Sequence, residues 1–349
     1  MKFLSKKNII FTINLLLFLY ILSILIKGVL IYHIWEGKKL PLHNGINLAF
    51  VKEEGGEKVI YCYLSDEKRL KKIYRITPKK DFIELRWLLF EDKLFLKQFY
   101  YTRVGMYTKV RKVGVIDCRS GKVVGVKDVI GKANLERVMD ALNVKNENKM
   151  WERCKLVNIG KKYNYFLYDL DNSTSTWKGT LLIERRSDGD LIKVKDVSYY
   201  YLDISPDERY IVYGLRGEDY RNKGEIYLFD IEKREKIFLC KGKYPFFYRD
   251  SQEIVYRYNR DEDIFRGELR RYDLRDKRFS TFINPSTRKP YPGNLLEGES
   301  VIVSDRECLY MLYRQSSYKY PLVEVNLSKG DYEILVGDVL SYAVGRSGR

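Results

Sequence analysis

The sequence has only two histidines, and both precede the segment whose pattern predicts a folded domain. His33 and His43 lie within the first 45 of the 349 residues. A Ser-His-Asp or Cys-His nucleophile system needs an imidazole beside the nucleophile, and zinc sites commonly use one as well. The sequence also lacks a G-x-S-x-G elbow, a P-loop and a G-x-G-x-x-G motif. These absences exclude the common hydrolase, zinc and nucleotide-binding sites from the folded segment, so we expect no catalytic residue of these kinds, no metal and no cofactor there.

Cysteine is also scarce and scattered. The five cysteines are Cys62, Cys118, Cys154, Cys240 and Cys308, with no C-x-x-C pair among them. An odd number cannot all pair within the chain. Most lie within or beside predicted strands, where a free cysteine behaves as a small buried hydrophobic residue. We therefore expect a fold that does not depend on disulfides, and the cysteines do not identify a redox compartment.

The chain is rich in sheet-forming residues, and residues 196–239 display the basic unit. This stretch predicts four short strands separated by a tight S-P-D turn, a longer polar loop and a second turn. Its strands are dominated by aromatic and β-branched residues, which suit a pleated, half-buried surface. Four antiparallel strands of this length are typical of one blade of a β-propeller.

The same unit recurs along the chain. Asp230 in the central copy corresponds to Asp273 in the next, 43 residues later. Further copies have Asp117, Glu184 or Asn326 at this position. A regular spacing of this size is characteristic of repeat architectures.

The first copy, which begins near residue 46, lacks its opening strand, and a matching strand occurs at the very end of the chain. We therefore predict an all-β fold over residues 46–349, a six-bladed β-propeller closed by one C-terminal strand and three N-terminal strands. Such closure leaves no free edge in the ring. A β-sandwich, or two smaller β domains, is the alternative.

A helical insertion near residues 134–145 interrupts the strand pattern. Leu135, Val138, Met139 and Leu142 follow helical spacing, and Asn134 is a candidate N-cap. We expect the apolar stripe to pack on the ring and the helix to lie on the face that carries the longer loops. A helix that docks a partner is the alternative.

The N-terminal part predicts a membrane anchor. Residues 1–8 are basic, and residues 9–26 are 18 apolar or small uncharged residues apart from Asn14. This length is about the minimum for a transmembrane helix and exceeds the usual core of a cleaved signal peptide, which is the alternative. Residues 27–45 would form a juxtamembrane linker. Lysines lie on both sides of the run, but the closeness of the first three favours a cytoplasmic N-terminus and an extracytoplasmic propeller.

The central copy carries a family resemblance. Its pattern resembles the repeats of TolB-type six-bladed propellers, which also occur in the propeller domains of prolyl oligopeptidases and dipeptidyl peptidases. The matching residues are Ser205, Pro206, Asp207, Ile226, Tyr227 and Asp230. Glu208 replaces the usual glycine after the S-P-D triplet. The resemblance implies a scaffold that binds proteins or peptides, and the chain has no room for the hydrolase domain of the peptidases.

Two functional classes remain open. One is a membrane-anchored, non-enzymatic binding or scaffold protein of the cell envelope. The other is a glycan-active or other hydrolytic enzyme with a carboxylate site in the propeller channel. Asp203, Asp250 and Glu299 are the only acidic candidates for such a site. They fall beside predicted turns, which favours the binding protein.

Charge and loop composition suggest where a partner would bind. The chain carries +17, and its first 45 residues contain six lysines and one glutamate, which leaves +12 for the propeller. A basic surface attracts an anionic protein, glycan or lipid, and nucleic acid is disfavoured outside the cell. A generic lysine-rich surface is the alternative. The loops opposite the membrane supply the candidate binding residues Arg103, Tyr107, Lys109, Arg111, Trp177, Lys178, Arg216, Tyr220, Arg221, Arg260, Arg266, Tyr318, Lys319 and Tyr320.

Overall fold

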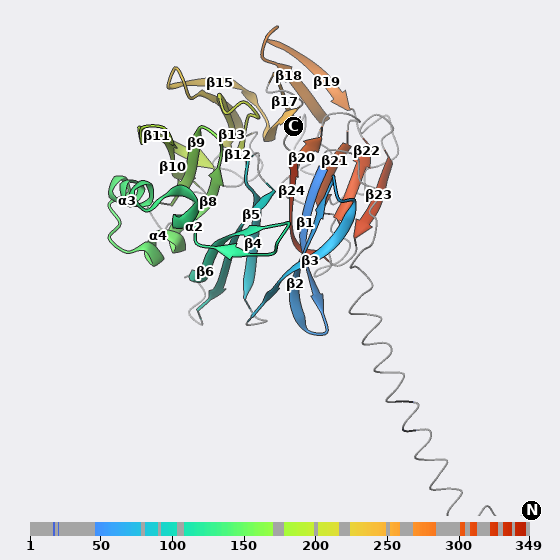
Figure 1. Ribbon diagram of the computed structural model, residues 1–349. Helices are drawn as coiled ribbons and strands as arrows, with labels where there is room; N and C mark the ends of the chain where they lie inside the picture. Colours follow the sequence, from blue (N-terminus) through green and yellow to red (C-terminus); the bar gives the residue numbers. More distant parts are fainter. Residues whose placement is uncertain are drawn as a thin grey trace, which may run out of the picture.

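The computed structural model describes residues 17, 20, 46–77, 81–89, 92–102, 108–169, 178–198, 202–215, 224–248, 252–258, 268–283, 301–303, 308–312, 322–326, 331–336 and 339–346. These residues form six four-stranded sheets (Figure 1). Within each sheet, neighbouring strands are antiparallel. We number the sheets one to six along the chain.

The first three sheets contain the ends of the chain and the only helices of the described domain. Sheet one consists of β24 (Val339–Arg346), β1 (Ile46–Glu54), β2 (Glu57–Leu64) and β3 (Arg69–Ile76). Sheet two consists of β4 (Phe82–Trp87), β5 (Lys93–Tyr101), β6 (Thr108–Asp117) and β7 (Val123–Val124). Sheet three consists of β8 (Cys154–Ile159), β9 (Tyr163–Tyr168), β10 (Lys178–Arg185) and β11 (Leu191–Ser198).

The remaining sheets repeat the same order. Sheet four consists of β12 (Leu202–Ile204), β13 (Tyr210–Leu215), β14 (Glu225–Asp230) and β15 (Glu235–Lys241). Sheet five consists of β16 (Lys243–Tyr248), β17 (Glu253–Tyr258), β18 (Glu268–Asp273) and β19 (Arg278–Ile283). Sheet six consists of β20 (Val301–Val303), β21 (Cys308–Leu312), β22 (Leu322–Asn326) and β23 (Asp331–Val336).

The first strand of each sheet lies toward the centre of the molecule. β24 lies beside β4 and β20, β4 beside β8, and β16 beside both β12 and β20. The last strand of the chain pairs with the first, with Ile46 opposite Arg346 and Phe50 opposite Tyr342. The pairing between the two ends of the folded segment is therefore as the sequence predicts.

The repeated aspartate shapes the turn between the third and fourth strands. Asp230 accepts a hydrogen bond from the backbone N–H of Lys233 at 3.0 Å, and Asp273 accepts one from Arg275 at 2.8 Å. Each turn then places a residue in the left-handed region, with φ of 57° at Arg234 and 54° at Lys277. A short side-chain acceptor that bonds its own turn explains why this position recurs in the sequence.

These turns define two ends of the sheets. We call the end with the first-to-second and third-to-fourth strand turns the turn face. We call the opposite end, which carries the second-to-third connections such as the one after Tyr101, the loop face. Because alternate strands run in opposite directions, β24 ends and β1 begins at the turn face.

The insertion between sheets two and three contains three helices rather than one. They are α2 (Val126–Ile130), α3 (Lys132–Ala141) and α4 (Glu147–Arg153). Leu135, Val138 and Leu142 are buried, which confirms the predicted apolar stripe. The predicted N-cap is wrong, because α3 begins after Gly131 and the Asn134 side chain donates to the Ile130 carbonyl at 2.8 Å.

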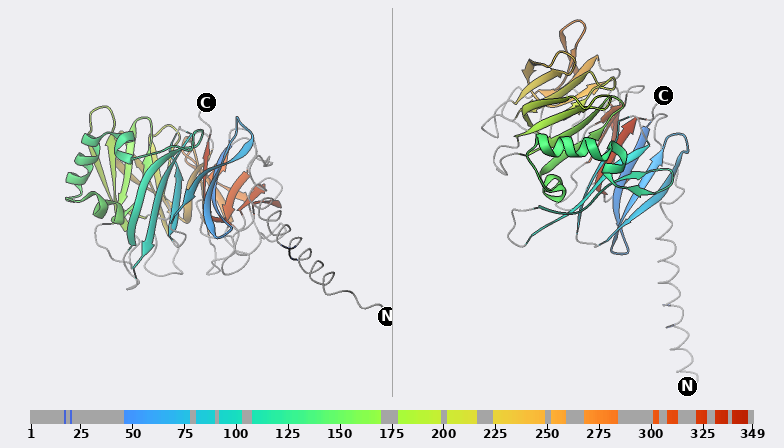
Figure 2. Two further views of the ribbon diagram at one scale, coloured as in Figure 1. Left: turned by 60° about the horizontal axis from the view of Figure 1, so that its bottom comes forward. Right: turned by 60° about the vertical axis from the view of Figure 1, so that its left-hand side comes forward.

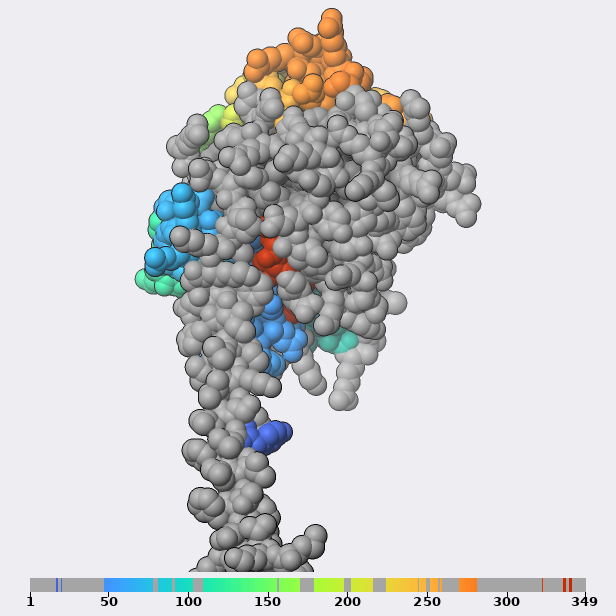
Figure 3. Space-filling view, turned by 90° about the vertical axis from the view of Figure 1, so that its right-hand side faces the viewer, coloured from blue at the N-terminus to red at the C-terminus, as the bar shows by residue number. Residues whose placement is uncertain are grey.

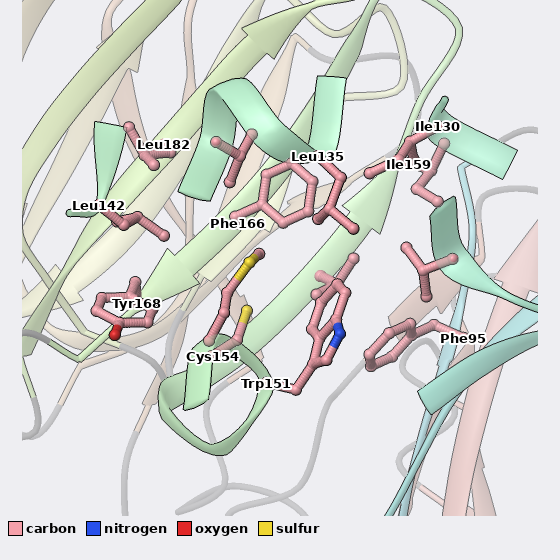
Figure 4. Packing of buried hydrophobic residues seen from close by; sticks show 14 of the residues in the cluster. Phe95, Ile130, Leu135, Leu142, Trp151, Cys154, Ile159, Phe166, Tyr168 and Leu182 are labelled. Atoms are coloured by element: carbon pink, nitrogen blue, oxygen red, sulfur yellow. The ribbon is translucent and has the colours of Figure 1, made fainter. Parts of the chain in front are cut away.

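The helices pack between two neighbouring sheets. The buried cluster joins Phe95 of sheet two and Phe166 of sheet three to Leu135 and Trp151 of the helices (Figure 4). Figure 2 shows from two sides that the helices cover the outer part of these sheets. The apolar stripe of the helix is thus buried against the chain's own sheets.

The insertion reaches both ends of the sheets. Arg137 of α3 lies against Gly189, in the turn between β10 and β11, and 3.5 Å from the buried Glu184 carboxylate. The expectation that this helix lies on the loop face is therefore wrong for this part of α3. At the other end, Glu152 of α4 pairs with Lys109 at the start of β6 at 3.4 Å.

No helix of the described residues is both long and apolar enough to cross a membrane. The predicted anchor, residues 9–26, lies outside the described residues except for Leu17 and Tyr20. Those two residues are helical and exposed.

Glu208 fastens sheet four to sheet three. Its carboxylate is buried and accepts hydrogen bonds from the backbone N–H groups of Lys161 at 2.7 Å, Lys162 at 3.1 Å and Tyr163 at 3.1 Å. Its backbone has φ of 58°, the left-handed conformation in which glycine is the usual residue. Glu208, which replaces the glycine of the family pattern, therefore adopts a less favourable backbone conformation, and its side chain links two sheets.

This link leaves no room for a side chain at Gly160. A β-carbon there would overlap the Glu208 carboxylate. We expect Gly160→Ala to lower the free energy of unfolding by about 1–3 kcal/mol, as overpacking of a well-filled interior typically does. Thermal or urea unfolding measures it. In a chain that already carries Glu208→Gly, the same alanine should cost clearly less; an equal cost in both chains would contradict this account.

Candidate binding surface

Three of the fourteen candidate binding residues lie within the described structure: Lys109 and Arg111 on β6, close to the loop face, and Lys178 at the start of β10. The other eleven lie outside the described residues: Arg103, Tyr107, Trp177, Arg216, Tyr220, Arg221, Arg260, Arg266, Tyr318, Lys319 and Tyr320. Their grouping on one face therefore stays a prediction, and the surroundings of Arg111 supply the geometry of the candidate site.

Arg111 is held by a buried carboxylate. Its Nε lies 2.6 Å from Oδ2 of Asp81, which precedes β4 and is 2% exposed. The same oxygen accepts a hydrogen bond from Gln98 Nε2 at 2.7 Å. The guanidinium also stacks on the Tyr100 ring at 4.8 Å. Arg111 thus has a structural role, while 44% of its side chain remains exposed.

Aromatic rings reach the surface at the same end of sheet two. Phe82 and Tyr101 meet edge to face, with centroids 4.9 Å apart, and Phe99 stacks on Phe82 at 5.8 Å. Phe82 is 48% exposed and Tyr101 is 53% exposed. Large exposed rings supported by a third ring are characteristic of surfaces that bind partners.

Cationic side chains lie at the same end of sheets one and two. Lys58 of sheet one donates to the Asp81 carbonyl at 2.6 Å and lies 5.6 Å from the centre of the Phe82 ring. Lys109, which is half exposed, lies two residues before Arg111 on β6. We call Lys58, Phe82, Tyr101, Lys109 and Arg111 the aromatic–basic surface. It combines apolar contact area with positive charge at the loop face.

Further charges lie beneath this surface. Lys97 is buried, donates to the Cys154 carbonyl at 2.5 Å and lies 3.9 Å from Glu84. Burial, and then the positive charge of Lys97, lower the pKa of Lys155 on β8. The carboxylates of Asp169 and Glu84 act in the opposite direction. The two lysines are close enough to repel each other, and the two carboxylates nearby offset their positive charge.

The described residues offer little for covalent chemistry. Asp203, the one predicted channel carboxylate among them, accepts the backbone N–H of Phe247 at 2.8 Å and so joins sheets four and five. Burial raises the pKa of the Cys118 thiol and raises that of Cys240 to about 11, which disfavours the reactive thiolate. No group of three or more metal-ligating side chains occurs in the part of the chain that the structure describes. Asp250 and Glu299 lie outside that part.

Phe82 and Tyr101 are not among the predicted binding residues, because the candidates were all assigned to loops. Both residues belong to strands, and their exposure arises only where β4 and β5 reach the loop face. One signal is present in the sequence: Tyr101 lies two residues before Arg103, the first candidate in the basic loop.

Comparison with known proteins identifies the architecture. The structure of TolB from Acinetobacter baumannii matches with a TM-score of 0.55 and 11% sequence identity, covering 88% of this chain and 68% of that one. The fold is a β-propeller. A prolyl endopeptidase structure matches with a TM-score of 0.48 and 12% identity, and this chain covers 50% of its length. No family model matches the sequence, and no curated protein does either. At these identities the likeness of the propeller concerns the fold alone.

The structural role of Arg111 can be tested by measuring the free energy of unfolding. We expect Arg111→Gln to lower the free energy of unfolding by about 1–3 kcal/mol, because the buried Asp81 loses a charged hydrogen bond. Lys109→Gln is the matched control two residues away. Its pair with Glu152 is exposed, so it should cost less than about 1 kcal/mol. Urea unfolding of both variants measures the difference; equal losses would mean that the Asp81 contact is not structural.

Proposed function

We propose that this chain is a membrane-anchored β-propeller of the cell envelope that binds an anionic partner through its loop face and is not an enzyme. In this proposal the six sheets are six blades of one ring, closed by β24 from the end of the chain and three strands from its beginning. The observation that carries the binding function is the exposure of Phe82 and Tyr101 at the end of sheet two that also carries Lys109 and Arg111. Aromatic residues and arginine are enriched where proteins bind partners.

The partner's charge follows from the surroundings of these rings. The aromatic–basic surface contains three cations: Arg111 is paired with the Asp81 carboxylate, Lys109 lies 3.4 Å from the Glu152 carboxylate, and Lys58 donates to the Asp81 backbone carbonyl. Residues 46–349 also carry a net charge of +12. Such a surface favours an acidic protein, an anionic glycan or anionic lipid headgroups, and it accelerates their association at low salt.

The membrane location rests on the sequence. The run at residues 9–26 is long enough to span a bilayer, and Leu17 and Tyr20 within it are helical. The proposed arrangement is a single span in the cytoplasmic membrane with a cytoplasmic N-terminus. The turn face, where β1 begins, then looks toward the membrane, and the aromatic–basic surface looks away from it.

Protease treatment tests this arrangement. In intact cells stripped to their cytoplasmic membrane, added protease should digest the propeller, because the N-terminal lysines remain inside. A cytoplasmic protein must stay intact in the same sample as a control for lysis. Protection of the propeller until the cells are lysed would reverse the proposed orientation. Release of the chain from washed membranes by high salt alone would contradict the proposed transmembrane anchor.

Binding of defined polyanions tests the surface. The full chain, in discs of neutral phosphatidylcholine, is titrated with polyglutamate, polygalacturonate and phosphatidylglycerol vesicles. We expect at least one probe to bind at low salt and to dissociate as salt screens the charges. Lys109→Glu should weaken this binding about tenfold, a loss of about 1.4 kcal/mol. The double variant Phe82→Ser, Tyr101→Ser should do the same.

Lys233→Glu is the matched control. Lys233 is an exposed lysine in the β14–β15 turn, on the turn face, and its reversal changes the net charge equally. Binding to this variant should be unchanged. Equal weakening by Lys109→Glu and Lys233→Glu would leave only a generic basic surface. No binding of any probe by the folded wild-type chain would contradict the proposed function.

A further inference from the structure

Two of the five cysteines meet inside the folded chain. Cys62 lies on β2 of sheet one, and Cys118 directly follows β6 of sheet two. Both are buried, with exposed fractions of 1% and 0%, in the cluster that joins these two sheets. The two thiols are hydrogen-bonding partners. The structure thus brings together a pair of thiols that the scattered cysteines of the sequence do not indicate.

The backbone of each cysteine is fixed. Cys62 lies within β2, opposite Ala49 of β1 on one side and Lys71 of β3 on the other. The backbone N–H of Cys118 donates to the Asp92 carbonyl at 2.9 Å. Neither cysteine can therefore move away from the other without disturbing the hydrogen bonds of its own sheet.

Contacts between sheets one and two hold the boundary next to Cys118. Arg119, the following residue, pairs with Asp66 in the β2–β3 turn at 2.7 Å. A β-carbon at Gly121 would lie 2.9 Å from the carbonyl oxygen of Ile73, so the backbones of the two sheets are in close contact there. Figure 3 shows blue residues of sheet one at the left edge of the molecule, with blue-green residues from later in the chain beside them. The residues that follow Cys118 thus set its position relative to sheet one.

The other cysteines belong to other parts of the fold. Cys154 is buried in the cluster of sheets two and three. Cys240 packs against the cluster of sheets four and five, where its hydrogen-bonding partner is Tyr256. Cys308 begins β21 of sheet six. Only the first two cysteines of the chain share one sheet boundary among these positions.

From this geometry we propose that Cys62 and Cys118 form a disulfide between sheets one and two when the chain folds in the presence of a disulfide oxidant. One cysteine thiolate attacks the oxidant's disulfide, which forms a mixed disulfide and releases one thiol. The second cysteine thiolate then displaces the other half of the oxidant as a second thiol. The protein loses two S–H bonds and gains one S–S bond, while the oxidant takes up two electrons and two protons.

Burial determines when this bond can form. The folded boundary covers both thiols, and burial raises the pKa of Cys118, which disfavours its reactive thiolate. The exchange therefore takes place while sheets one and two are coming together, and packing then protects the bond. The fold is complete with both thiols free, so the bond adds stability by restricting the unfolded chain. Disulfides persist in oxidising compartments, such as the extracytoplasmic location proposed above.

Cell-free synthesis of the full chain into discs of neutral phosphatidylcholine tests the proposal. Because the oxidant is supplied, the result does not depend on the proposed location or on the aromatic–basic surface. One sample contains glutathione and its disulfide, and the other contains a reductant. Free thiols are then blocked with a maleimide in denaturant, and the peptides are mapped by mass spectrometry. We expect a linked Cys62–Cys118 peptide in most oxidised chains, with blocking at Cys154, Cys240 and Cys308, whereas all five cysteines are blocked in the reduced sample.

Variants and melting temperatures sharpen the test. Cys62→Ala and Cys118→Ala should each abolish the linked peptide. Cys154→Ala, which removes a cysteine buried at the next sheet boundary, is the matched control and should retain it. The oxidised wild-type chain should melt about 3–6 °C above the reduced chain, and the difference should vanish in the first two variants.

Three results would overturn the proposal. The first is blocking of all five cysteines after oxidising synthesis. The second is linkage of Cys62 or Cys118 mainly to another cysteine or to a second chain. The third is a lower melting temperature of the linked chain, which would mean that the bond distorts the sheets. Peptide mapping of the wild-type chain decides the first two results even where a variant fails to fold.

Discussion

The structure depends on burial between neighbouring sheets. Sheets two, three and four are apolar on both sides, so none of them could bury its side chains alone. The clusters that pair sheets one with two, two with three, three with four, and four with five are each built from the facing sides of two sheets. This burial supplies the main favourable free energy, and it also fixes the repeat, because each blade must match the shape of the next.

Polar contacts add precision where apolar packing cannot. Glu208 binds three successive N–H groups of the adjacent sheet, and Asp203 binds Phe247 across the next boundary. Hydrogen bonds of this kind have direction, so they set how far one sheet is displaced along the other. The pKa of Asp273 is lowered by the N–H groups of its own turn, which shows that these acceptors favour the ionised carboxylate. A scaffold fixed in this way can hold binding side chains at constant positions.

The proposed binding surface is a place where this packing ends. Phe82 and Tyr101 lie on the side of sheet two that faces sheet three, at its loop-face end, and both are about half exposed. Ile237 and Phe279 are exposed to a similar extent on the outer strands of sheets four and five. In both cases residue types suited to the interior reach the surface. An exposed apolar side chain alone would need no explanation, whereas a supported group of them next to positive charge favours recognition.

Much of the local pattern follows from short-range features of the sequence. Alternating aromatic and β-branched residues gave the strands, and the S-P-D triplet and the recurring aspartate gave turns whose bonds span two or three residues. The incomplete first repeat, with its missing strand at residues 339–346, predicted the pairing of β24 with β1. These features could be predicted because they depend on neighbouring residues in the chain or on a repeat that is recognisable in the sequence.

Which side chains are buried could be established only from the three-dimensional structure, not from the sequence. Glu208 looked like a poor substitute for glycine and proved to be a buried acceptor for residues 161–163, more than forty positions away. Arg111, a candidate binding residue, proved to hold Asp81, while Phe82 and Tyr101, which no sequence motif singled out, proved exposed. Burial and ion pairing depend on which distant segments meet, and that is set by the packing of whole sheets rather than by any local sequence pattern.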